Sequence, residues 1–260
     1  MRSTRLTIAY VVLMIAASAG AHAQPPQTGG SARPARPFVE HGFITIGAGV
    51  QAAADPLADR VQFETNAETG SIDATYPGRS GVLFDATVGV HVRRHIGIAV
   101  GVARATRSGA AAVSADIPHP FFDNQPRTVE GDARDVTRSE TSIHMQLYYD
   151  LRPGRSWRVR LFGGPSYVDV EQELVTEVEA RETFPFDTAE FDSATIRKGS
   201  GSGIGFNAGL EAARMFSSRI GLGGSIRYVR ASIDLSAPGA RSVSTDGGGL
   251  QAAAGLRFAF

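Results

Sequence analysis

The chain has 260 residues, no cysteine, and 26 basic side chains balanced by 26 acidic ones. Without cysteine it forms neither disulfides nor thiolate metal sites, and it cannot be a lipoprotein acylated at a cysteine. Its neutral charge gives no reason to expect a nucleic-acid partner.

The first residues have the pattern of a secretory signal peptide. Two arginines precede a mostly apolar stretch, and the small residues Ala21 and Ala23 follow as a signal-peptidase site. A retained membrane anchor is the alternative, but the apolar run is shorter than the ~20 residues that a spanning helix needs. We therefore predict a signal peptide over residues 1–23 and a flexible periplasmic lead-in, rich in Pro, Gly and Ser, over 24–38.

Beyond residue 38 the dominant pattern is an alternation of apolar with small or polar side chains, which is typical of β-strands. The alternating segments lie at about 44–51, 84–91, 96–103, 142–149, 157–168, 204–211, 220–228 and 250–260. In each segment one face is apolar, and the other carries Gly, Ala, Ser or charged residues. Each segment therefore predicts a strand whose two faces lie in different environments.

Short and long connections alternate between these segments. Long polar connections are expected at about 53–79, 108–138, 174–201 and 236–247. Transmembrane barrels have this order, with short periplasmic turns and long external loops. We therefore predict an all-β fold over residues 39–260, an eight-stranded antiparallel transmembrane up-and-down β-barrel with both termini in the periplasm. Ten strands are the alternative, because segments at 61–64 and 72–76 can pair, and we expect that pair to be a hairpin in the first external loop.

Alternation alone would also fit a soluble barrel with an apolar interior. The small and charged face suits the narrow interior of an eight-stranded barrel, which places the apolar face in lipid. Trp157 and Tyr167 lie about 25 Å apart along the membrane normal, which matches the height of an outer-membrane apolar band. The predicted aromatic girdles contain Trp157, Tyr167, Tyr149, Phe216 and Tyr228.

The last strand ends in alternating apolar residues, Leu256, Phe258 and the C-terminal Phe260. With this ending the chain resembles the small OmpA-like and OmpX-like outer-membrane β-barrel family. The resemblance implies residence in the bacterial outer membrane, among its lipids and lipopolysaccharide. It also implies recognition of the C-terminal strand by the barrel-assembly machinery, with periplasmic chaperones as partners during biogenesis.

Glu140, Ser142 and His144 are the strongest catalytic candidates, because a carboxylate, a hydroxyl and an imidazole alternate on one strand face. Side chains two residues apart on one face are ~7 Å apart, too far for a direct hydrogen bond. These three also face the barrel interior. We therefore predict no catalytic residue. The histidines are dispersed, so no metal site and no cofactor are expected.

Charged residues on the non-apolar face are expected to meet inside the barrel. The predicted lumen charges are Asp85, Arg158, Arg160, Glu211, Arg227 and Arg257. Charges in a narrow lumen are costly unless they are paired. A structural plug of ion pairs is therefore favoured over a proton or ion path.

The sequence indicates an integral outer-membrane protein, not an enzyme, with a structural or surface-interaction role carried by its external loops. A lipid A-modifying enzyme and a small-solute pore are the alternatives. The alternation continues from Val168 to Glu179, so one strand is expected to project beyond the membrane as an arm of an exposed hairpin. The surface ligand is unknown.

Overall fold

The computed structural model describes residues 40–53, 55–154, 156–239 and 241–260. The predicted signal peptide, its cleavage site at Ala21 and Ala23, and the lead-in over 24–38 lie outside the described residues. The described residues, from Glu40 to Phe260, belong to one compact unit. Among the described residues, no helix is long and apolar enough to cross a membrane.

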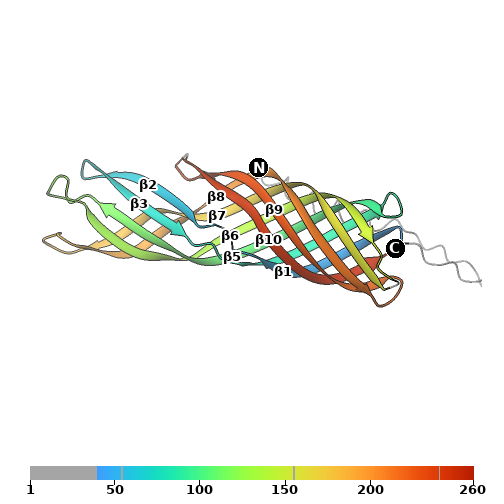
Figure 1. Cartoon of the computed structure of the whole chain (residues 1–260). Coiled ribbons are helices and arrows are strands. Elements are labelled where there is room, and N and C mark those ends of the chain that lie inside the picture. Colours follow the sequence, from blue (N-terminus) through green and yellow to red (C-terminus); the bar gives the residue numbers. More distant parts are fainter. Residues whose placement is uncertain (1–39, 54, 155, 240) are drawn as a thin grey trace, which may run out of the picture. The chain divides into compact units, whose positions relative to one another are not determined.

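The described part of the chain folds into ten β-strands, shown in Figure 1. They are β1 (Gly42–Gln51), β2 (Leu57–Thr65), β3 (Glu68–Tyr76), β4 (Gly81–His91), β5 (Ile96–Ile117), β6 (Arg127–Leu151), β7 (Trp157–Glu182), β8 (Ala189–Met215), β9 (Ile220–Ala237) and β10 (Arg241–Ala259). All pairings between them are antiparallel.

Eight of these strands close into a ring. The order runs β5, β4, β1, β10, β9, β8, β7, β6, and the pairing of β6 with β5 completes the circle. The remaining two, β2 and β3, form a hairpin, and β3 pairs with β5 through Ser71–Thr75. The prediction of eight barrel strands with a hairpin in the first long connection is confirmed.

The two ends of the barrel differ. At one end lie the short turns after β4, β6 and β8, together with Phe260, whose carbonyl accepts a 2.7 Å hydrogen bond from the amide of His41. We call this the near end, and we call the opposite end, which carries the long hairpins, the far end. Both described termini of the barrel are therefore at the near end.

The alternation predicted from the sequence sets the two faces of each ring strand. On β7, Trp157 and Tyr167 are each 46% exposed, whereas Arg160 is 1% exposed. Large apolar side chains also point outward on the neighbouring strands, among them Ile46, Phe84, Ile98, Leu147, Phe206 and Leu222. The barrel therefore has a polar interior and an apolar outer band.

The long connections are shorter than predicted. β5 continues to Ile117 and β6 begins at Arg127, so most of 108–138 is strand. β7 and β8 likewise occupy most of 174–201, and β9 and β10 occupy most of 236–247. The prediction of loops there was wrong because polar residues on the outward face of these projecting strands resemble a loop composition. The expected projecting arm over Val168–Glu179 is confirmed, since β7 continues to Glu182.

At the far end the ring opens into facing layers with an apolar core of their own. The pairing of β6 with β7 stops at Arg138 and Gln172. Beyond this point β2, β3, β5 and β6 form one sheet, and its inner face packs against β7 and β9. The shared core contains Leu57, Ile72, Ala74, Tyr76, Ala111, Val113, Ala115, Ala133, Val136, Leu174, Val175 and Ala237. We call this part of the protein the far-end extension.

Candidate functional site

A layer of paired charges fills the barrel interior at the near end. Arg160 and Arg257 both bind Glu211, with N–O distances of 3.1 and 2.9 Å. Arg257 also binds Glu40 at 2.7 Å. The ring of Phe43 packs against both guanidinium groups, 3.5 Å from the Arg160 carbon and 4.3 Å from the Arg257 carbon. These side chains are buried, so they close the near end of the lumen.

A second layer crosses the middle of the barrel as a chain of hydrogen bonds. Arg227 donates to the carboxylate of Asp85 at 2.6 Å and to the side-chain oxygen Oε1 of Gln251 at 2.9 Å. The Gln251 amide donates to Gln51 at 2.9 Å, and the Gln51 amide donates to Glu140 at 2.8 Å. Each of these five side chains has a hydrogen-bond partner within the network, as buried polar networks require.

The six charges predicted for the lumen, Asp85, Arg158, Arg160, Glu211, Arg227 and Arg257, all lie on the inner face. Arg158 lies closest to the opening and bonds Glu40 at 3.1 Å. The residue that sequence reasoning missed is Glu40, which joins Arg158 to Arg257. Glu40 precedes β1, so no strand alternation marked it as an inward-facing residue.

The structure does not join the three catalytic candidates. Glu140 binds the guanidinium groups of Arg107 and Arg138, while Ser142 and His144 remain separate on the same face of β6. His144 instead bonds Ser166 of β7 through Nδ1 at 2.8 Å. Its Nε2 atom has no partner among the described residues, so no carboxylate orients this histidine. The described residues also contain no group of three or more potential ligands that could hold a metal ion.

The predicted girdle residues all point outward. Trp157, Tyr167, Tyr149, Phe216 and Tyr228 are between 42% and 68% exposed. The three C-terminal positions Leu256, Phe258 and Phe260 lie on the same outer face, between 38% and 48% exposed. Rings with an apolar body and a polar edge suit the boundary between lipid and water.

The tips of the two longest hairpins are joined at the far end. Arg127 donates to the carbonyl oxygens of Pro118 and Phe186, each at 3.1 Å, and forms a 2.6 Å ion pair with Glu182. The same tips expose Phe121 and Phe184 at 69% and 81%. This joined tip was not predicted, because it links residues about sixty positions apart in two turns that share no periodicity. The only signal is the presence of phenylalanines in otherwise polar turns.

Comparison with protein families shows that a family model described as outer membrane protein beta-barrel domain matches residues 42–258. Among solved structures, the chain is similar to the outer membrane protein OprG from Pseudomonas aeruginosa, with 11% identity, a TM-score of 0.45, and coverage of 85% of this chain and 97% of that one. It is also similar to Neisserial surface protein A, with 12% identity, a TM-score of 0.39, and coverage of 84% and 97%.

A third similar structure is the outer membrane protease OmpT from Escherichia coli, with 9% identity, a TM-score of 0.42, and coverage of 84% of this chain and 97% of that one. Among curated proteins, no sequence matches the chain.

Proposed function

Since this chain belongs to the outer membrane protein beta-barrel domain family, we propose that it is a closed outer-membrane barrel that displays its far-end extension outside the cell as a binding surface. In this proposal the near end faces the periplasm, because outer-membrane barrels have short turns there and longer connections outside. The aromatic girdles contact the two lipid boundaries, and lipopolysaccharide surrounds the base of the extension.

The observation that carries this proposal is the second apolar core in the far-end extension. Ile72 and Leu174, from β3 and β7, are 2% and 0% exposed and pack in one cluster beyond the last β6–β7 pair. Burial of such side chains contributes about 1.5–3 kcal/mol each. The extension is thus held as ordered β-structure instead of hanging as flexible loops, which favours presentation of a defined surface.

The joined tip is the part of this surface best suited to a partner. Phe121 and Phe184 are strongly exposed there, in the same two turns as the exposed Asp123 and Asp187. Exposed aromatic side chains are costly in water and are common anchors in protein interfaces. We therefore place the partner-binding surface at the tip.

The other two functions are less well supported. A pore would have to pass the layer of Arg160 and Arg257, the layer of Arg227 and Asp85, and the core of the extension. A lipid A-modifying enzyme would need its catalytic groups on the lipid-facing surface, whereas His144 and Ser166 are 0% and 3% exposed inside the barrel. Both features favour a role on the outer surface.

Cysteine labelling of intact cells tests the display of the far end. The chain has no cysteine, so single substitutions give one reactive site each. Asp123→Cys lies in the tip, and Ser218→Cys lies in a near-end turn of similar exposure. We expect a membrane-impermeant maleimide to label Asp123→Cys on intact cells and Ser218→Cys only after the outer membrane is permeabilised. The reverse pattern would overturn the proposed orientation.

The same proposal assigns the C-terminal residues Leu256, Phe258 and Phe260 to recognition by the barrel-assembly machinery. Their outward position on the last strand leaves them accessible before the barrel closes. Replacing Phe260 with Ser should reduce the heat-modifiable, folded band from outer membranes and increase the periplasmic, chaperone-bound fraction. An unchanged folded fraction would remove this role from Phe260.

A further inference from the structure

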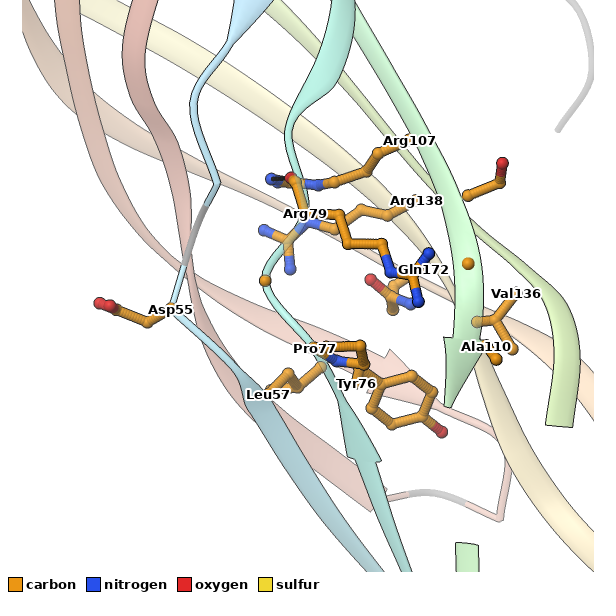
Figure 2. Close-up of a pocket in the computed structure, with 13 residues that line it drawn as sticks. Asp55, Leu57, Tyr76, Pro77, Arg79, Arg107, Ala110, Val136, Arg138 and Gln172 are labelled. Carbon is orange, nitrogen blue, oxygen red and sulfur yellow. Dashed lines mark hydrogen bonds between the residues drawn. The ribbon is translucent and has the colours of Figure 1, made fainter. Parts of the chain in front are cut away.

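A pocket lies at the base of the far-end extension. It is small, with a cavity volume of about 50 Å³, and lies between the β3–β4 connection and β5. Figure 2 shows the side chains of Arg79, Arg107 and Arg138 around this pocket, with that of Arg79 extending toward Gln172. The carboxylate of Asp55 points away from the three arginines (Figure 2).

The wall is open here because β5 changes its partner. β4 pairs with β5 up to Thr106, and β3 pairs with it from Ala112 onward. Residues 107–111 of β5 therefore have no strand beside them on that side. On its other side β5 pairs with β6. The register of that pairing shifts between Gly109 and Ala111, so β5 bends at the same point. The pocket is thus a consequence of how the extension is attached to the barrel.

The two inner arginines of the pocket carry one more positive charge than the carboxylate that they share, although their guanidinium groups are hydrogen-bonded. Arg107 and Arg138 both bind the same carboxylate, that of Glu140. Glu140 also accepts hydrogen bonds from Gln51 and from the amide of Gly248. One carboxylate therefore serves two guanidinium groups, and a positive charge remains in a partly buried place.

Arg79 adds a third positive charge at the mouth of the pocket. Its guanidinium group forms no ion pair or hydrogen bond with the described residues, and its side chain lies across Gly109. A Cβ atom at Gly109 would come within 2.6 Å of the Arg79 Nε atom, so the glycine creates the space in which this side chain lies. The planar fork of arginine matches the oxygens of a phosphate group.

The position of the pocket relative to the apolar band points to the source of the anion. Val82 of β4 is 57% exposed and is the last large apolar residue of that strand before the pocket. Arg79 lies three residues before Val82 in the chain, which is about 10 Å in an extended segment. In the proposed orientation this is the level of the lipid headgroups in the outer leaflet.

We propose that this pocket, which we call the arginine pocket, binds a phosphate monoester, held by Arg79 at the mouth and by the positive charge of Arg107 and Arg138 behind it. Two sources supply this chemistry, the phosphate of a glycolipid in the outer leaflet and a soluble phosphate monoester. This ligand would bind at the base of the displayed extension. The proposal rests on the proposed function only in placing the pocket at the level of the lipid headgroups. Binding by the purified protein does not depend on that orientation.

Native mass spectrometry of the full barrel in detergent tests the proposal. Lipid A with both phosphates, the same lipid without phosphates, and glucosamine 1-phosphate are added separately. We expect binding of the phosphorylated probes only. Arg79→Gln should weaken it roughly tenfold, the loss expected for one hydrogen bond to a charged group. Tighter binding of lipid A than of glucosamine 1-phosphate identifies the glycolipid as the source, and equal binding identifies a soluble ester.

Two further variants keep the test specific. Arg104→Gln removes an exposed arginine from the outer face of the same strand and should leave binding unchanged. Gly109→Ala keeps all charges but displaces Arg79, and it should weaken binding severalfold while the heat-modifiable band remains. If the phosphate-free lipid binds equally well, or if Arg104→Gln weakens binding as much as Arg79→Gln, the arginine pocket is not a phosphate site.

Discussion

Asp85 of β4 and Arg227 of β9 are 142 residues apart in the chain and 2.6 Å apart in the lumen. Two other strands, β1 and β10, separate them around the ring, so this ion pair spans the interior. Both side chains are nearly inaccessible, at 9% and 5% exposure. A buried charge of this kind is tolerated because its partner is present.

Removing the carboxylate of that pair should therefore destabilise the barrel. We expect Asp85→Asn to lower the free energy of unfolding by about 3–5 kcal/mol, since it leaves Arg227 buried without its anion. Urea unfolding followed by heat modifiability measures the effect. The control is Arg230→Gln, which breaks an outward pair with Asp246 that is about half exposed and should cost less than about 1 kcal/mol. Equal losses in the two variants would show that the lumen pair has no structural role.

The core of the far-end extension should be separable from the barrel. Ile72→Ala removes a buried side chain from that core, which typically costs about 2–5 kcal/mol. We expect faster hydrogen exchange and faster proteolysis in β2 and β3, while the heat-modifiable barrel persists. Ile204→Ala, at an outward position that is 80% exposed, is the control and should change neither. Loss of the folded barrel in Ile72→Ala would mean that the two parts fold as one unit.

The joined tip should depend on Arg127. Replacing this arginine with Gln removes its ion pair with Glu182 and weakens its contact with the Phe186 carbonyl. Spin labels placed on the two hairpin tips should then report a broader distance distribution. Arg181→Gln, which breaks an exposed pair with Asp192 within one hairpin, should leave the distribution narrow. If both variants give the parent distribution, other contacts hold the tips together.

The extension should also become unstable in alkali through Tyr76. Burial raises the pKa of this phenol to about 12, and its oxygen accepts a 2.7 Å hydrogen bond from the amide of Val175. An unfolded tyrosine has a pKa of about 10, so the folded state disfavours the charged form. The stabilisation is complete below pH ~10 and is lost as the pH rises towards 12.

Proteolysis by an alkali-tolerant protease between pH 9 and 12 measures this loss of stability. It is preferred to hydrogen exchange, because the chemical rate of amide exchange itself changes with pH. We expect β3 to become susceptible in that range in the parent protein. Tyr76→Phe should be less stable at neutral pH by about 1–3 kcal/mol, because the amide loses its acceptor, but should lack the alkaline transition. A transition of equal size in both proteins would assign it to another group.

The ring could be predicted from the sequence because each strand has two different environments. On the segment that became β7, Trp157 and Arg160 were assigned correctly to opposite faces by alternation alone. Of the extension, only the arm from Val168 to Glu179 was predicted in this way, and β7 does continue to Glu182. In the rest of it the inner face is again apolar or small, as at Ala111 and Val113, and the outer face is polar, so the composition resembles that of a loop.

The arginine pocket was beyond prediction for another reason. It lies where the neighbouring strand of β5 changes from β4 to β3. This change depends on which strands pair, and no local sequence pattern indicates it. Glu140 illustrates the same limit. Its spacing to His144 indicated a catalytic group, yet its actual partners are Arg107 and Arg138, which lie opposite each other on the paired strands β5 and β6.

Conductance of the purified protein in planar bilayers tests most directly whether the function resides outside the barrel. With Arg160, Arg257 and Arg227 paired across the lumen, we expect no ion-conducting steps in the parent protein, under conditions in which an added porin gives clear steps. A steady conductance that increases in Arg227→Ala is the opposite result. It would show that ions pass through the layers described here and would make a solute pore the better assignment.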